Sequence, residues 1–96
     1  LAFECFLVAS KNGSPEGMFL YGEMLEKRGS QKDIKEAAKF YKSAADNGNI
    51  DAMYRLATML DYGDGINENI KEAIKYYKKA TDNNHQEAMF RYAMIL

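Results

Sequence analysis

Few residues in this chain of 96 could carry out chemistry, and they do not group in the sequence. Its one histidine, His85, has no cysteine, second histidine or pair of carboxylates at metal-ligand spacing around it. We interpret His85 as a surface histidine in a turn, and Cys5 as a small buried apolar residue rather than a reactive thiolate. These residue types predict no catalytic residue, no metal site and no cofactor, which indicates a protein that is not an enzyme.

The segment from Asp61 to Glu72 has the length of a calcium-binding loop but lacks its ligands. Glycine occupies positions 63 and 65, where oxygen ligands are needed, and Ile66 stands where such a loop requires glycine. The segment therefore predicts a loop between structural elements and no calcium site.

Two arginines, Arg55 and Arg91, are the charged residues whose spacing is most informative, because they lie 36 residues apart at equivalent places in similar segments. Guanidinium groups that recur in this way suggest an electropositive strip that holds carboxylates of an acidic partner through paired hydrogen bonds. Ordinary solvated arginines are the alternative interpretation.

The elements that position these residues follow from an internal repeat. The stretch from Lys35 to Ala44 reappears from Lys71 to Ala80, which gives a period of 36 residues. A second set recurs at offsets of 35 and 36 residues, namely Gly17, Tyr21, Gly22 and Leu25, then Ala52, Leu56, Ala57 and Leu60, then Ala88, Tyr92, Ala93 and Leu96.

Each half of the repeat has the apolar spacing of an amphipathic helix, so the unit is a pair of helices. We predict helices over 1–11, 15–28, 31–46, 51–62, 68–82 and 86–96. The chain then divides into the second helix of a partial repeat at 1–13, repeats at 14–48 and 49–84, and the first helix of a partial repeat at 85–96. Tyrosine and phenylalanine between the helices fill the core, and the tyrosine hydroxyls require polar partners.

The stretch from Ala52 through Leu56-Ala57, Gly63-x-Gly65 and Tyr76-Tyr77 to Ala80 resembles the Sel-one-like repeat family, a relative of the tetratricopeptide repeat. The resemblance covers essentially the whole chain as about two and a half units. It implies an all-α, right-handed solenoid whose members mostly serve as adaptors in protein complexes, and it implies no catalytic residue.

We predict that the partner-binding surface is the concave face formed by the first helix of each pair. Counted from Gly17, Ala52 and Ala88, the fourth and seventh residues of these helices point away from the core. A column of aromatic residues, Phe19, Tyr54 and Phe90, lies beside them. Whether the methionine columns beside them bind a partner or only pack is left open. The predicted partner-binding residues are Phe19, Leu20, Glu23, Tyr54, Arg55, Thr58, Phe90, Arg91 and Met94.

Composition limits the partners. Thirteen basic against fourteen acidic residues give a formal net charge of −1, which argues against nucleic acid as the main partner. No apolar run approaches the roughly 20 residues that span a membrane, so no membrane insertion is expected. A single cysteine favours a reducing compartment, and therefore the cytoplasm.

The predicted function is a protein-interaction scaffold or adaptor segment. The apolar stripe of helix 86–96 has no covering helix, so the chain is expected to be part of a longer solenoid or to stack end to end on identical chains. A structural spacer or self-assembly element is therefore the alternative function.

Overall fold

The computed structural model describes residues 4, 8, 12–63 and 65–95, and every structural statement concerns these residues. The predicted helix 1–11 and the interpretation of Cys5 lie outside the described residues, apart from positions 4 and 8. The described chain holds five helices, which are α2 (Pro15–Arg28), α3 (Gln31–Asp46), α4 (Ile50–Tyr62), α5 (Ile70–Asp82) and α6 (Gln86–Ile95).

Side chains at the helix starts explain where the helices begin. Ser14, Ser30, Asn49 and Asn69 each accept a hydrogen bond from the backbone N–H three residues ahead. Helix α5 starts two residues later than predicted, because Asn69 is its cap and residues 67–69 still belong to the loop. Helices α2 and α4 end at glycines with left-handed backbone, which other residues adopt only at a cost.

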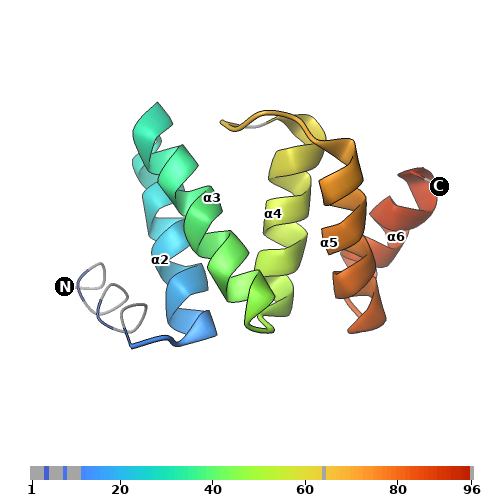
Figure 1. The fold of residues 1–96 in the computed structure, drawn as a ribbon, viewed down its shortest axis with the longest axis horizontal. Helices are drawn as coiled ribbons and strands as arrows, with labels where there is room; N and C mark the ends of the chain where they lie inside the picture. Colours follow the sequence, from blue (N-terminus) through green and yellow to red (C-terminus); the bar gives the residue numbers. More distant parts are fainter. Residues whose placement is uncertain (1–3, 5–7, 9–11, 64, 96) are drawn as a thin grey trace.

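The helices form a zigzag in which each one packs against the helix before it and the helix after it. Figure 1 shows the five helices side by side along the long axis of a molecule that measures 41 × 26 × 16 Å. The first helices of the pairs, α2, α4 and α6, form one layer, and the second helices, α3 and α5, form the other. Figure 1 shows a separation between the upper parts of α3 and α5, which the loop after α4 partly spans.

Alanines at the recurring small positions let the two layers approach closely. Ala37, Ala44, Ala52, Ala57, Ala73 and Ala80 are completely buried, and large side chains such as Tyr41, Tyr77 and Met59 fill the space between them. Gly22 serves the same purpose, since a Cβ there would lie 2.8 Å from the Tyr41 ring. Ala93 of α6 occupies the position of Ala57 but is exposed, as expected for a helix that no second helix covers in the described chain.

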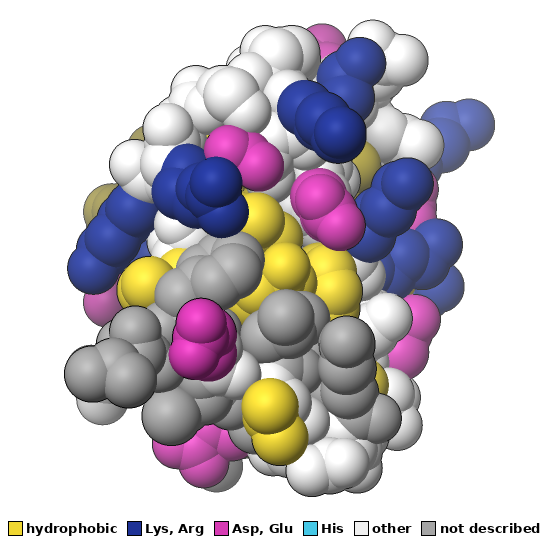
Figure 2. Space-filling view, turned by 90° about the vertical axis from the view of Figure 1, so that its left-hand side faces the viewer, with side chains coloured by type: hydrophobic (Ala, Val, Ile, Leu, Met, Phe, Trp, Pro, Cys, Tyr) yellow, Lys and Arg dark blue, Asp and Glu magenta, His cyan; other side chains and the backbone are white. Residues whose placement is uncertain are grey.

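Basic side chains gather on the second helices. Eight lysines lie on α3 and α5, at positions 32, 35, 39, 42, 71, 75, 78 and 79. Figure 2, which views the molecule from the end of α2 and α3, shows Lys and Arg side chains concentrated over the upper half of that end.

Candidate partner-binding face

The face of α2, α4 and α6 is called the inner face below, and it carries two neighbouring hollows. The first hollow has a volume of about 510 Å³ and draws residues from all three first helices and from the turn before α6. Its lining contains five of the predicted partner-binding residues, Phe19, Glu23, Tyr54, Arg55 and Thr58, together with Asp51, His85 and Glu87.

The second hollow lies between α4 and α6 and has a volume of about 450 Å³. It brings in the predicted residues Phe90, Arg91 and Met94, and it shares Tyr54 and Glu87 with the first hollow. The ninth predicted residue, Leu20, is partly buried and lines neither hollow.

Two acidic residues of this face, Asp51 and Glu87, are not among the predicted residues, whereas the acidic Glu23 is. Asp51 and Glu87 both line the first hollow, and they lie 36 residues apart, which is the period of the repeat. The same offset that pointed to the arginines would therefore have found them.

The aromatic column contributes both to the core and to the hollows. The Phe19 ring lies 5.6 Å from that of Tyr41, and the Tyr54 ring lies 6.1 Å from that of Tyr77, as measured between centroids. Phe90 has no such neighbour from a following helix in the described chain, and it is 70% exposed. The column thus contributes the partly buried rings of Phe19 and Tyr54 and the exposed ring of Phe90 to the inner face.

Two methionine columns run beside the predicted residues, one formed by Met18, Met53 and Met89 and the other by Met24, Met59 and Ile95. Their members on α4, which has a helix on each side, pack into the core and line neither hollow. Met53 and Met59 of α4 are 6% and 2% exposed, so both belong to the core. On α6, Met89 of the first column is exposed, as is Met94, which belongs to the predicted partner-binding residues and not to a column. Met53 and Met59 therefore pack in the core and are not part of a partner-binding surface.

Arg55 does not stand free on this face. Its guanidinium lies 3.5 Å from Glu23 Oε2 and 3.4 Å from Glu26 Oε1, and Tyr41 Oη donates a 2.6 Å hydrogen bond to that same Glu26 oxygen. Burial and this hydrogen bond raise the pKa of Tyr41 far above its ordinary value, so the hydroxyl keeps its proton.

Arg91 repeats the arrangement one unit later. Its Nε donates a 2.8 Å hydrogen bond to Oδ2 of Asp61, and Tyr77 Oη donates a 3.0 Å bond to the same oxygen. Burial and the Asp61 carboxylate raise the pKa of Tyr77 in the same way as for Tyr41. The bond to Asp61 also raises the pKa of Arg91 and holds the guanidinium charged.

The prediction that Arg55 and Arg91 form an electropositive strip is therefore wrong. Each arginine is neutralised by a carboxylate of the preceding first helix, Glu26 or Asp61, and these carboxylates lie 35 residues apart in sequence. We name the two sets Glu26–Tyr41–Arg55 and Asp61–Tyr77–Arg91 the inter-repeat triads. They join successive repeats, and they leave the first hollow with the carboxylates of Glu23, Asp51 and Glu87 against the single guanidinium of Arg55.

His85 is more than the surface turn residue that the sequence suggested. Its Nδ1 accepts a 3.1 Å hydrogen bond from the N–H of Ala88, so the imidazole caps α6 as Asn49 caps α4. The ring stacks on Tyr54 with centroids 4.6 Å apart, and its Nε2 lies 3.7 Å from Asp51 Oδ1. These contacts leave the side chain only 16% exposed.

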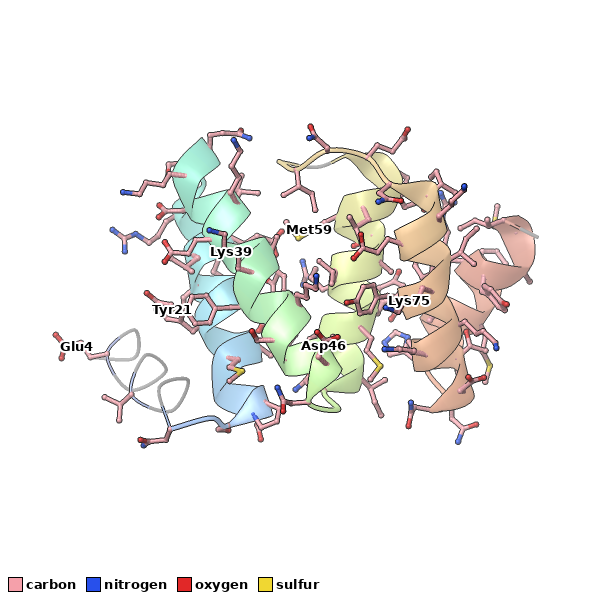
Figure 3. The ribbon with its side chains drawn as sticks, in the orientation of Figure 1. Glu4, Tyr21, Lys39, Asp46, Met59 and Lys75 are labelled. Atoms are coloured by element: carbon pink, nitrogen blue, oxygen red, sulfur yellow. The ribbon has the colours of Figure 1, made fainter. Side chains whose placement is uncertain are left out.

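Two further findings limit the chemistry of the described residues. Among them, no three His, Cys, Asp or Glu side chains come together in a way that could hold a metal ion. None of the helices α2 to α6 combines the length and apolar character required to cross a bilayer. Figure 3 shows charged side chains distributed along both layers, with Lys39 and Lys75 on the second helices.

Comparison with known proteins places these helix pairs in a family. The model of the Sel1 repeat matches residues 15–49 and 50–85. The crystal structure of a Sel1 repeat protein from Oxalobacter formigenes is 30% identical with a TM-score of 0.80, and the match covers 88% of this chain and 35% of that one. The crystal structure of a protective antigen present in uropathogenic Escherichia coli strains, which displays an SLR fold, is 27% identical with a TM-score of 0.88.

The second match covers 97% of this chain and 20% of the antigen, so the chain spans only a minor part of the length of either structure. The predicted all-α solenoid of helix pairs is confirmed by the five helices and by the fold of these neighbours. Because the repeat model matches most of the chain, this protein belongs to the Sel1 repeat family.

Proposed function

We propose that this chain is a non-catalytic scaffold segment that binds a protein partner on its inner face. Sel1 repeats commonly serve as protein-interaction scaffolds. The observation that carries the proposal is the pair of adjoining hollows, which gather eight of the nine predicted partner-binding residues on one side of the array.

The chemistry of the hollows fits a peptide segment with apolar or aromatic anchors. Tyr54 lines both hollows, and the exposed side chains of Phe90 and Met94 extend the apolar surface along α6. Rigid aromatic rings beside flexible methionine are typical of surfaces that accept side chains of a partner.

The charges of the inner face favour basic rather than acidic groups on the partner. Arg55 and Arg91 are occupied by the inter-repeat triads, whereas the side chain of Asp51 is 70% exposed and Glu87 is also exposed. A lysine or arginine of the partner would find both a carboxylate and the ring of Tyr54 at the first hollow.

The direct test uses variants that remove apolar surface without disturbing the triads. Phe90→Ser/Met94→Ser changes two exposed side chains of the inner face, and Ile70→Ser changes a 39% exposed apolar side chain on α5 as the matched control. Affinity capture with the unaltered protein and the two variants, with mass spectrometry and helicity measured in parallel, is expected to lose its partners in the double variant only. Equal capture by all three proteins would contradict inner-face binding.

Charge reversal of Arg55 and Arg91 is not a suitable test, because both guanidinium groups pair with carboxylates of the inter-repeat triads. Glutamate at position 91 would place a second carboxylate beside Asp61, which is 7% exposed. The charge of the face is better tested with Asp51→Asn/Glu87→Gln, which we expect to weaken binding of a basic partner while the triads stay intact.

End-to-end self-association is the second candidate, and one observation favours it. Ala57 and Met53 of α4 are buried beneath neighbouring helices, whereas the equivalent Ala93 and Met89 of α6 are exposed. Light scattering over a wide concentration range tests this candidate, with Met89→Glu as the variant. A monomer at all concentrations would contradict it. The longer solenoid, the partial repeats at both ends and the cytoplasmic location remain predictions.

A further inference from the structure

Another hollow, distinct from the two on the inner face, lies on the opposite side of the array, between helices α3 and α5. It is larger than either hollow of the inner face, with a volume of about 690 Å³. We call it the outer groove. Its lining consists of Gln31, Lys35, Ala38, Lys39 and Lys42 of α3, Leu56 and Leu60 of α4, Gly63, Gly65, Ile66 and Asn67 of the loop, and Glu72 of α5.

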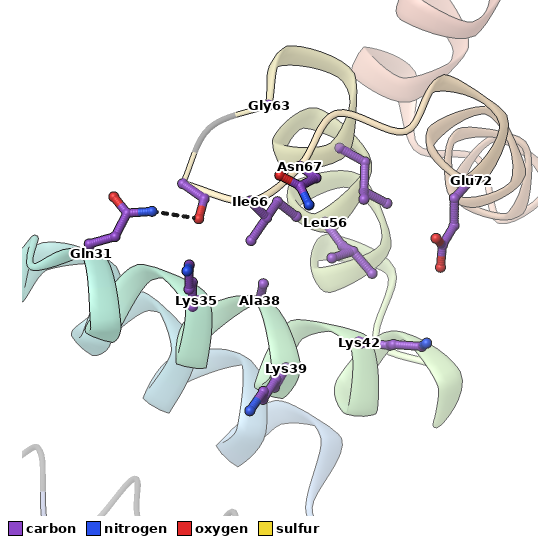
Figure 4. Close-up of a pocket in the computed structure, with 12 residues that line it drawn as sticks. Gln31, Lys35, Ala38, Lys39, Lys42, Leu56, Gly63, Ile66, Asn67 and Glu72 are labelled. Carbon is purple, nitrogen blue, oxygen red and sulfur yellow. Dashed lines mark hydrogen bonds between the residues drawn. The ribbon is translucent and has the colours of Figure 1, made fainter.

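Two contacts between distant parts of the chain lie near the ends of α3, which forms one wall of the groove. At the start of α3, Gln31 Nε2 donates a 3.0 Å hydrogen bond to the carbonyl oxygen of Gly65, which ties the loop across the groove (Figure 4). At the other end of α3, Tyr76 Oη of α5 donates a 3.2 Å bond to Oδ1 of Asp46. The lining on α3 runs from Gln31 to Lys42, which corresponds to roughly 17 Å of helix.

The floor of the groove is apolar. Leu56 and Leu60 of α4 lie beneath it, and the partly buried Ile66 extends from the loop toward α3, as Figure 4 shows. Ala38 adds a small apolar side chain on the wall of α3.

One wall carries positive charge that nothing in the described chain neutralises. Lys35, Lys39 and Lys42 are all exposed, and none of the ion pairs within 4 Å among the described residues includes them. Among the described residues of the lining, the one acidic side chain is that of Glu72, which stands on the opposite wall and already accepts a 3.3 Å hydrogen bond from Asn69. Lysines without an ion pair in the described chain thus line this groove, whereas both arginines of the inner face are paired.

We infer that the outer groove binds an acidic peptide segment of a partner protein. The three lysines follow one another at about one helical turn, roughly 5–6 Å apart, which matches carboxylates on every second residue of an extended peptide or on successive turns of a helix. An apolar side chain between these carboxylates contacts Ile66 and Leu56. A short groove with an apolar floor suits a segment of this kind better than a continuous polyanion such as a nucleic acid. The inference is independent of binding at the inner face.

The test uses a defined probe. An eight-residue peptide of alternating glutamate and leucine, labelled with fluorescein, is titrated into the 96-residue chain at low ionic strength, and the same peptide with glutamine in place of glutamate is the charge control. Chemical shifts of the ¹⁵N-labelled chain are expected to move at residues 31–42 and 63–67. Absence of binding at millimolar peptide, or shifts confined to the inner face, would overturn the inference.

The chain offers a matched control for the lysines. Lys35→Gln/Lys39→Gln/Lys42→Gln is expected to weaken binding at least tenfold. Lys71→Gln/Lys75→Gln/Lys78→Gln removes the same charge one repeat later, on a face of α5 that lies outside the lining of the groove, and is expected to weaken binding less than threefold. Circular dichroism verifies that both variants fold. Equal weakening by the two variants would show attraction to net charge alone and would overturn the inference.

Two other classes of anion are measured in parallel. A twelve-nucleotide polythymidine and vesicles with anionic lipid are titrated under the same conditions. If either binds more tightly than the peptide and depends on the same three lysines, the groove recognises phosphate and the assignment to an acidic peptide is wrong.

Discussion

The Nε of Arg91 lies 2.8 Å from Oδ2 of Asp61, although the two residues are 30 positions apart in the sequence. Asp61 is the buried charged residue of the described core, and Tyr77 donates a second bond to the same oxygen. Arg55, Glu26 and Tyr41 repeat this pattern in the preceding unit. The inter-repeat triads therefore satisfy carboxylates that burial would otherwise make unfavourable, and they link each first helix to the next one.

Loss of the guanidinium from a triad should destabilise the array. Arg91→Met leaves the buried Asp61 carboxylate with the Tyr77 hydroxyl as its remaining partner, and we expect the melting temperature to fall by several degrees. Arg28→Met is the control, because the Arg28 side chain is 58% exposed and its distance to Asp33 is 3.8 Å. Thermal unfolding followed by circular dichroism compares the two, and an equal effect would contradict a structural role for the triad.

The buried tyrosines predict a loss of stability at alkaline pH. Burial and the hydrogen bond to Asp46 raise the pKa of Tyr76 to about 12, whereas tyrosine in an unfolded chain ionises near pH 10. Below about pH 10 both states hold the proton, and between about pH 10 and 12 the unfolded state loses it first, so the free energy of unfolding falls as the pH rises. Burial raises the pKa of Tyr41 and Tyr77 too, which extends the effect to higher pH.

Urea unfolding between pH 8 and 11 measures this dependence. Tyr76→Phe should make the decline above pH 10 less steep, because this side chain then no longer ionises in either state. An unchanged slope in the variant would show that Tyr76 does not contribute.

The loop that crosses the outer groove depends on the glycine at position 65. Gly65 has φ of +77°, and a Cβ there would overlap Cγ2 of Ile34. Gly48 also has positive φ, at +100°, but a Cβ there would meet no atom within 4 Å. Gly48→Ala should therefore cost only the backbone strain of about 1–2 kcal/mol, and Gly65→Ala should cost at least about 1 kcal/mol more, as measured by urea unfolding. Equal costs would mean that the loop moves away from Ile34 without penalty.

The imidazole cap of α6 can be tested by restoring the residue found one repeat earlier. His85→Ala removes the acceptor for the Ala88 N–H, and we expect a loss of about 0.5–2 kcal/mol in the free energy of unfolding. His85→Asn supplies the acceptor that Asn49 provides for α4, and should recover most of that loss. If both variants are equally unstable, the stacking of His85 on Tyr54 matters more than the cap.

The helix pairs and their family could be predicted from the sequence because both depend on local, periodic features. Amphipathic spacing, the 36-residue period and capping residues such as Ser14 and Ser30 are visible along the chain and act over one or two turns. The same spacing identified eight residues that line the hollows of the inner face, since the faces of a helix follow from position alone.

The pairing of charges depended on tertiary structure. Arg55 and Arg91 stood out by their period, but the sequence did not show that Glu26 and Asp61 would lie within hydrogen-bond reach, because the partners come from different repeats and meet only when the helices stack. The outer groove also depended on tertiary structure. In the sequence, Lys35, Lys39 and Lys42 resemble other surface lysines, and only tertiary packing places the loop and the leucines of α4 beside them. Helical periodicity determines which way a side chain faces, and tertiary packing determines which side chain it meets.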